Sequence, residues 1–340
     1  MPSPERTVRR FRRAAPSRGV ALVSVLLIVA LASALAYQML SRHGLTIAHS
    51  EQLLRGGQAR EYALAAEAFA RQLLAEDWSD EETRAADTLL EPWAEPSPPF
   101  EIEDGEIVLA IVDLNARFNL NGVIGKGGPD NVERLKQLVA NLELEPVIAD
   151  TWVDWVDPDS DVNAAGAEDE TYLLSVPAYR AANQPAASTS ELLAVRDVTP
   201  ADYAALRPHV AWLPETGLRV NVNTAGYEVL RSLAPGLSEE EAETLIESDR
   251  EFQEVAEATA QHAALGNSVA AIAVMSEYFE VRIRAELEDT QVTLASMLHR
   301  DPTTGRVRLL ARDFGRDFRP VDPPAGENDD AYADDAPAVR

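Results

Sequence analysis

The first long apolar stretch of the chain has the length of a membrane-spanning helix. Residues 20–40, VALVSVLLIVALASALAYQML, contain no charged residue, and eleven of these 21 residues are Leu, Ile or Val. At 1.5 Å per residue they extend about 31 Å, which matches the hydrocarbon core of a bilayer. Their summed insertion free energies, roughly −3 to −6 kcal/mol, favour the membrane. The pattern therefore predicts a transmembrane helix rather than the buried helix of a soluble core.

A helical pattern continues beyond this segment. From Leu45 to Ala75 the apolar positions recur at spacings of three and four residues, which places them on one helix face. These positions are Ala59, Tyr62, Ala66, Phe69 and Leu73. Together the two stretches predict one helix of roughly 55 residues, about 80 Å long. We expect a rod whose first half is apolar all round and whose second half packs a domain against one face.

Strand patterns occur in two separate parts of the chain. The Pro-rich segment 92–99 predicts a linker, and a hairpin is expected at Phe100–Glu103 and Glu106–Leu114, around Asp104-Gly105. Three further strands are expected late in the chain, at Tyr278–Leu287, Val292–Leu298 and Val307–Arg312. A mostly helical block, about 123–275, lies between the two parts. The predicted fold class is α+β, with a long N-terminal helix on a small antiparallel sheet and a large helical insertion.

The block contains two short helices joined by a tight turn, similar to a helix-hairpin-helix module. Thr224, in VNVNTA (220–225), is expected to cap a helix at 225–233. Ser238 and Glu241 are expected to form a capping box for the next helix. Glutamates crowd the start of that helix and would repel phosphate. The module is therefore interpreted as structural packing, and nucleic acid is not an expected partner.

Composition and charge narrow the possible classes. The chain has 57 Asp and Glu against 30 Lys and Arg, a net charge of −27, so phosphate backbones are not a general partner. It contains no Cys, which excludes disulfides, zinc–thiolate sites and Cys nucleophiles. Residues 1–19 have the opposite charge, with six Arg and one Glu. Basic residues before an apolar helix keep the N-terminus in the cytoplasm, so the acidic bulk is expected on the other side of the membrane.

One acidic segment has the spacing of a calcium loop. In DWVDPDSDVNAAGAEDE (154–170), five residues stand at the offsets of calcium-loop positions 1, 3, 5, 7 and 12: Asp157, Asp159, Asp161, Asn163 and Glu168. Position 6 carries Val162 instead of Gly, so the sharp turn of a regular EF-hand is not expected, and a differently wound calcium loop is one possibility. The alternative is a solvated acidic loop without an ion. Flanking aromatic residues are expected to pin the loop to a core: Trp152, Trp155, Tyr172 and Tyr179.

Signals of catalysis are missing from the sequence. The five His residues are scattered without metal-ligand spacing, and there is no H-E-x-x-H or G-x-S-x-G motif. GVIGKGG around Lys126 lacks the spacing and the following Ser or Thr of a phosphate-binding loop. We therefore expect that the protein is not an enzyme.

Three fates are possible for the N-terminus. Ala34-Leu35-Ala36 would serve as the cleavage site of a secretory signal. Cleavage at the Gly19/Val20 junction would remove the basic leader and leave an intact apolar helix. Without cleavage, the segment would be a simple anchor.

The chain as a whole resembles protein K of the type II secretion system, a minor pseudopilin. The resemblance covers nearly all of residues 10–315. It rests on the basic leader that ends in Gly19 and on five internal segments: DLNARFNLN (113–121), DWVDPDSD…GAEDETY (154–172), VPAYRAANQP (176–185), SELLAV (190–195) and VNVNTA (220–225). Major pseudopilins have Glu as the fifth mature residue, whereas Ser24 stands there in this chain. Protein K members commonly lack that Glu, so Ser24 favours this family over its relatives.

This resemblance implies a processing step, a metal and a set of partners. The prepilin peptidase would cleave after Gly19 and methylate Val20. Calcium would bind near the acidic loop, with ligands among Asp157, Asp159, Asp161, Glu168 and Asp169. The protein would sit in the inner membrane by a single span, with its main domain in the periplasm. Its partners would be the inner-membrane assembly platform and the minor pseudopilins I and J, and also H, at the tip of the pseudopilus.

The sequence patterns and this resemblance together predict an organisation in chain order, in which the tail is assigned from its composition. It comprises a prepilin leader 1–19, the transmembrane and amphipathic helix 20–76, the first part of a pilin-like α/β domain 77–122, the helical insertion 123–275, the C-terminal strands 276–319 and a disordered acidic tail 320–340. The leading hypothesis is a tip subunit that primes and caps the filament during export of folded proteins across the outer membrane. The alternative is a membrane-anchored, calcium-dependent periplasmic binding module, and an envelope hydrolase is a weaker third.

Overall fold

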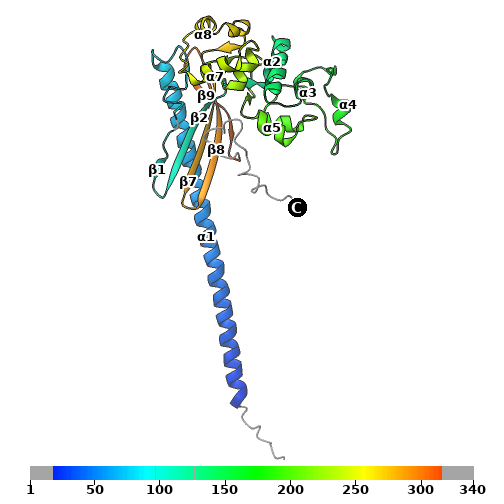
Figure 1. Ribbon diagram of the computed structural model, residues 1–340. Helices are drawn as coiled ribbons and strands as arrows, with labels where there is room; N and C mark the ends of the chain where they lie inside the picture. The colour runs from blue at the N-terminus through cyan, green and yellow to red at the C-terminus, as the bar shows by residue number, and fades with distance from the viewer. Residues whose placement is uncertain (1–17, 96, 126, 316–340) are drawn as a thin grey trace, which may run out of the picture. The chain divides into compact units, whose positions relative to one another are not determined.

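The computed structural model describes residues 18–95, 97–125 and 127–315 (Figure 1). The expected tail, at 320–340, and most of the leader lie outside these residues. The chain divides into two compact units after Gly57. Helix α1, Arg18–Ser79, runs through this boundary, and among the described residues it alone is long and apolar enough to cross a membrane. The long N-terminal helix predicted from the sequence is confirmed.

The second half of α1 packs against the sheet through a face of small residues. Its buried apolar positions are Ala59, Ala63, Ala66, Ala70 and Leu74. The predicted face was wrong in part, because Phe69 is 47% exposed and instead packs edge-on against Phe100. Alanines occupy these positions because a small side chain lets the helix backbone approach the sheet closely, whereas an aromatic ring would hold the backbone away.

The sheet has five antiparallel strands, in the order β1-β2-β7-β8-β9. Their bounds are β1 Phe100–Ile102, β2 Gly105–Asp113, β7 Tyr278–Leu287, β8 Thr290–Arg300 and β9 Val307–Asp313. The predicted hairpin and the three late strands are confirmed. β2 pairs with β7 over nine residue pairs, from Gly105↔Leu287 to Asp113↔Phe279, although more than 160 residues separate the two strands. Figure 1 shows the sheet lying along α1, and the α+β fold class is confirmed.

A buried carboxylate ties α1 to the far strands of the sheet. Glu67 is fully buried and accepts hydrogen bonds from Arg312 Nη2 at 2.8 Å and from Ser296 Oγ at 2.8 Å. Arg71 lies 3.3 Å away on the next turn of the helix. Burial by itself raises the pKa of Glu67, but the hydrogen bonds and charges of these partners outweigh it and lower the pKa below its ordinary 4.5.

The insertion between β2 and β7 is built from short elements. Its helices are α2 Gly128–Asn141, α3 Val147–Val156, α4 Asp169–Tyr172, α5 Pro200–Leu206, α6 Tyr227–Leu233, α7 Glu239–Glu247 and α8 Val255–Gln261. Three 3₁₀ turns occur at Leu120–Val123, Thr189–Ala194 and Ala263–Ser268. Two parallel pairs of two-residue strands bring distant segments together: β3 Phe118–Asn119 with β4 Val210–Ala211, and β5 Val220–Asn221 with β6 Ile272–Ala273.

The helix-cap predictions have different outcomes. The capping box of Ser238 and Glu241 is confirmed at the start of α7. The cap by Thr224 was wrong, because α6 begins at Tyr227 after Gly226. The Thr224 hydroxyl instead donates to Asp113 Oδ2 at 2.6 Å. A buried carboxylate competes for this hydroxyl more strongly than a backbone N–H can.

The segment predicted as a linker contributes to the core of the sheet. Trp93 is 2% exposed and packs edge-on against Phe279, with ring centroids 5.2 Å apart. A pure linker was therefore the wrong description, since burial of one indole outweighs the turn-forming tendency of the prolines around it.

We predict that Glu67→Gln lowers the free energy of unfolding by about 1.5–3 kcal/mol, the contribution typical of hydrogen bonds to charged groups. Since the folded pKa of Glu67 lies below its unfolded value, this stabilisation is present above about pH 4.5 and is lost as the pH falls through the folded pKa. Urea unfolding of the detergent-solubilised chain at pH 7 and pH 3.5 measures it. The exposed Glu61→Gln, on the same helix, is the control. Equal stability of the two variants at pH 7 would contradict the proposed role of Glu67.

Candidate functional site

Three carboxylates of the acidic segment interact through their charges near the end of α3. Asp154 lies on the last turn of α3 and is fully buried, Asp157 follows the helix, and Glu168 precedes α4 and is 3% exposed. Asp154 accepts hydrogen bonds from the backbone N–H of Asn163, at 3.2 Å to each carboxylate oxygen, and from the side-chain amide of Asn163. The sequence pattern did not single out Asp154, because its place on the apolar face of α3 gives no metal-ligand signal.

Several oxygen atoms of this group lack hydrogen-bond partners. Both carboxylate oxygens of Glu168 and Oδ1 of Asp157 are buried and accept no hydrogen bond from the residues that the structure describes. Burial, with the charges of Asp159 and Asp154, raises the pKa of Asp157 to about 6. Burial, with the charges of Asp154 and Asp157, raises the pKa of Glu168 to about 6. A cation among these oxygens would remove both the repulsion and the missing partners.

The other predicted ligands lie differently. Asp159 and Asp161 are exposed on the loop, and Asp159 Oδ1 accepts from the Asp161 N–H at 2.9 Å. Asp169 forms an ion pair with Arg180 and accepts from the Ala181 N–H at 3.1 Å. The carboxylate of Asp169 is thus directed to the segment after α4. The charge of Asp157, by contrast, acts on Glu168 and raises its pKa.

The loop winds around a glycine that is not at the expected position. A Cβ atom on Gly166 would lie 1.8 Å from Asp154 Oδ2, so only glycine fits there. The Gly166 N–H donates to Asn163 O at 2.9 Å and closes the turn. Val162 stands at position 6 of the calcium-loop spacing, and the glycine of this segment lies four residues further on.

Aromatic side chains that flank the loop pack in the core of the insertion, as predicted. Trp155 packs edge-on against Tyr172 at 5.3 Å between ring centroids, and Tyr172 lies 5.2 Å from Tyr179. Trp152 is fully buried and donates to Leu120 O at 2.9 Å. The loop is therefore fixed to the core of the insertion. Its unpartnered carboxylate oxygens, on Asp157 and Glu168, are of the type that hard cations such as calcium bind.

A second acidic group lies elsewhere, and it was not foreseen. Among the described residues, Asp77, Asp87 and Glu91 are the acids whose ligand atoms gather within 4.8 Å of one another, so this group could hold a metal. Burial and the charge of Asp77 raise the pKa of Glu91 to about 8. The three residues are ten and four positions apart in the sequence, a spacing that carries no known metal signal.

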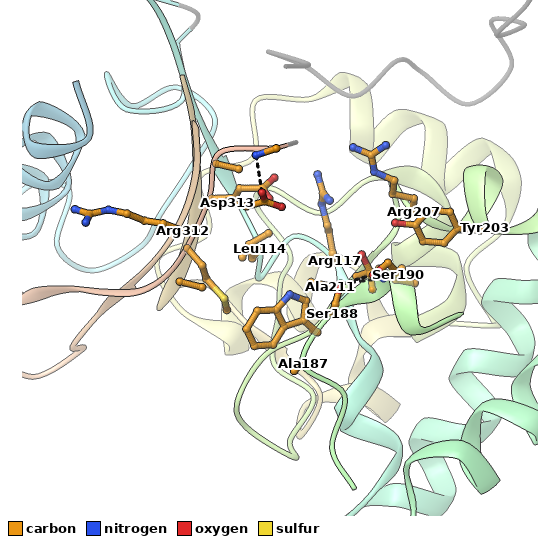
Figure 2. Close-up of a pocket in the computed structure, with 18 residues that line it drawn as sticks. Leu114, Arg117, Ala187, Ser188, Ser190, Tyr203, Arg207, Ala211, Arg312 and Asp313 are labelled. Carbon is orange, nitrogen blue, oxygen red and sulfur yellow. Dashed lines mark hydrogen bonds between the residues drawn. The ribbon is translucent and has the colours of Figure 1, made fainter. Parts of the chain in front are cut away.

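A cleft of about 570 Å³ lies beside β8 and β9 (Figure 2). Arg117, Arg207 and Asp313 are among the residues that line it, while Arg312 points to the opposite side, toward the helix that carries Glu67. Its serines, Ser188 and Ser190, hydrogen-bond each other at 2.7 Å. Among the described residues, its lining includes the carboxylates of Glu280 and Asp313 but no His, Lys or Cys.

The predicted cleavage site and the fifth residue after it lie on α1. Gly19 and Val20 fall at its start, and Ser24 lies about one turn further on. Together, the anchor-length helix, the antiparallel sheet packed on its second half and the helical insertion define a pilin-like α+β protein with one membrane-anchor helix.

The family models for protein K of the type II secretion system match residues 116–215 and 220–282. Protein K of Pseudomonas aeruginosa is 37% identical over 328 residues, which cover 91% of this chain and 96% of that protein. Protein K of Aeromonas hydrophila is 33% identical over 87% of this chain and 97% of its own length. The chain therefore belongs to the type II secretion system protein K family.

A solved structure has the same fold. It is the crystal structure of the GspK-GspI-GspJ complex from enterotoxigenic Escherichia coli, which matches 79% of this chain and all of the compared chain, with a TM-score of 0.71 and 25% identity. The resemblance inferred from the sequence motifs is thus confirmed. The expectation of no enzymatic activity is confirmed by the family, because protein K is a structural component of the secretion system.

We predict that calcium raises the thermal midpoint at pH 7.5, and that most of this effect is lost at pH 5. At 100-fold excess over the dissociation constant one ion contributes about 2.7 kcal/mol. Without calcium the sign reverses: the folded pKa values of Asp157 and Glu168, about 6, exceed their unfolded values, so stability rises as the pH falls from 7 to 5. Thermal unfolding across pH, with calcium or chelator, tests both trends.

The double variant Asp157→Asn/Glu168→Gln should reduce the calcium effect and be more stable than the parent when both are metal-free at pH 7.5. Glu240→Gln/Glu243→Gln, with both sites exposed on α7, makes the same change in charge and is the matched control. Hydrogen exchange at residues 157–170 localises the effect. If calcium slows exchange there equally in the parent and the double variant, these carboxylates are not the ligands.

Proposed function

We propose that this protein is the tip subunit of the pseudopilus and that it binds the minor pseudopilins I and J, and also H. The observation that carries the proposal is the position of the insertion. Asp113 ends β2 and pairs with Phe279 at the start of β7, so the insertion lies at this end of the sheet. Arg300 ends β8 at the same end and contacts Asp77 in the last turn of α1. The insertion therefore occupies the end of the sheet at which α1 ends.

A large insertion at that end supports a terminal role. In a filament built by repeated addition, each subunit must leave its upper surface free for the next. The insertion would obstruct that surface. Membership of the protein K family and the association of the E. coli relative with GspI and GspJ support the same assignment. In this role the protein primes assembly and caps the filament that drives folded proteins across the outer membrane.

We further propose that the anchor is processed between Gly19 and Val20, by the prepilin peptidase. The six arginines of residues 1–19 would hold the leader in the cytoplasm, which places the acidic domain in the periplasm. Ser24 bears on assembly, because a Glu at that place could pair with a neighbour's N-terminus inside the bilayer and a serine offers no such charge. The calcium ion of the acidic loop would then fix the outer part of the insertion, with Asp159, Asp161 and Asp169 as additional candidate ligands.

We predict a mature protein that begins with N-methylated Val20. Mass spectrometry of the chain purified from membranes of a secretion-competent host measures the N-terminus. Gly19→Val should block processing and abolish secretion, because a branched side chain replaces the smallest residue at the cleavage site. Gly44→Val, which also falls on α1 and where an added Cβ meets no atom within 4 Å, is the control. A mature N-terminus at Tyr37 would instead indicate a cleaved secretory signal, and an intact leader would indicate a simple anchor.

We also predict that the outer surface of the insertion stays accessible in the assembled filament. The chain contains no Cys, so single cysteines can be introduced without background. Val176→Cys, at a site that is 98% exposed, should react with a bulky maleimide before and after assembly. Leu54→Cys, on α1, should react only before assembly, because neighbouring helices cover it in a filament. Protection of Val176→Cys on assembly would argue for a position inside the shaft.

A further inference from the structure

The end of α1 and the segment that follows it carry three buried carboxylates that do not belong to the acidic loop. Asp77 lies in the last turn of α1, and Asp87 and Glu91 lie between α1 and β1. The side chain of Asp77 is 6% exposed and that of Asp87 is 2% exposed, while Glu91 is 6% exposed as a residue. One oxygen from each lies within 4.8 Å of one from each of the others. Such a concentration of buried negative charge requires compensation.

Arg300 supplies only part of this compensation. Its Nη1 donates to Asp77 Oδ2 at 2.7 Å, and its Nη2 contacts Asp87 Oδ1. One guanidinium therefore contacts two of the three carboxylates. Asp113, also buried, adds a fourth negative group next to Asp87, and its own oxygens are satisfied by neutral donors, namely Ser276, Thr224 and the Asn115 N–H. If these carboxylates are ionised, two or more negative charges have no cation beside them; otherwise protons must neutralise them.

A second observation, independent of the clustering, indicates a ligand. Oδ1 of Asp77 is buried and accepts no hydrogen bond from any described residue. By contrast, Asp87 Oδ2 accepts from the Ser276 N–H at 2.6 Å, and Glu91 Oε1 accepts from the Thr88 N–H at 3.2 Å. A buried carboxylate oxygen without a donor is costly unless something binds it.

The spacing of the oxygens matches the size of one cation. Calcium binds carboxylate oxygens at about 2.3–2.6 Å, so two oxygens on the same ion can be at most about 5 Å apart. The three oxygens meet this limit. Magnesium usually keeps several waters and is bound through only one or two carboxylates, so a buried group of three carboxylates favours calcium. We propose that Asp77, Asp87 and Glu91 form a second divalent-cation site, selective for calcium over magnesium, which clamps the end of α1 to β8 through the carboxylates that Arg300 also binds.

This site would act where the end of α1 meets the sheet. Glu91 also hydrogen-bonds the indole of Trp93, which packs in the core of the sheet. An ion shared by α1, the 87–91 segment and, through Arg300, β8 would therefore fix the helix end to the sheet. This role is separate from that of the acidic loop, and it does not depend on the position of the protein in the filament.

Calcium binding by the full chain in detergent tests the proposal. The background is the double variant Asp157→Asn/Glu168→Gln, which removes the loop site. We expect this variant to bind one calcium ion in isothermal titration calorimetry, with magnesium at least tenfold weaker. Adding Glu91→Gln should weaken binding at least tenfold, because a neutral amide replaces a charged ligand. The control is Glu95→Gln, at an exposed site four residues further along the chain, and it should retain calcium binding.

Two results would overturn the proposal. One is the absence of any calcium binding in the double variant, which would mean that a proton, held by one of the three carboxylates, balances the charge instead. The other is equal calcium affinity with and without Glu91→Gln. If Glu91→Gln does not fold, hydrogen exchange can be measured on the double variant instead, because its three cluster carboxylates are unchanged. Calcium should slow exchange at residues 77–91, and unchanged exchange would overturn the proposal.

Discussion

A buried polar junction holds together parts of this protein that lie far apart in sequence. Asn221, from the insertion, donates to Asp87 O at 3.0 Å and to Ser276 Oγ at 2.8 Å, and Arg300 donates to Ser276 O at 3.1 Å. These groups come from the segment between α1 and β1, from the insertion, from the residues just before β7 and from β8. In a low-dielectric interior each bond strengthens its neighbours, and each missing bond is costly. The return of the chain to the sheet after the insertion therefore depends on this junction as a unit.

Much of the fold follows from local patterns in the sequence. The apolar run at 20–40, the hairpin at Asp104-Gly105 and the late strands were all predicted, because periodicity and turn residues act over a few positions. Interactions across the fold were not predictable in this way. The alanine face of α1 and the role of Thr224 depend on which distant surface each residue meets. The loop acids were found through their spacing, whereas Asp154 and Gly166 became visible only through contacts.

The distribution of carboxylates separates two physical situations within one acidic chain. Most of the 57 acidic residues need no partner, because water solvates them. Glu67 is buried, but arginines hold it in its charged form. In the loop and around Asp77, carboxylates are buried with too few positive partners, and there each group must take up a proton or share a cation. The same residue type thus serves as surface charge, as a structural ion pair or as a candidate ligand, according to its neighbours.

The position of the insertion connects this chemistry to assembly. A filament of identical contacts is open-ended, because every subunit presents the surface that the next one needs. Extra mass at that surface stops addition only if it is rigid, since a mobile insertion could move aside. Rigidity at this end comes from the Asn221 junction and from the aromatic support of the acidic loop. Cations at the loop and at Asp77 would strengthen both regions. The capacity to end a filament would therefore depend on charge compensation as much as on size.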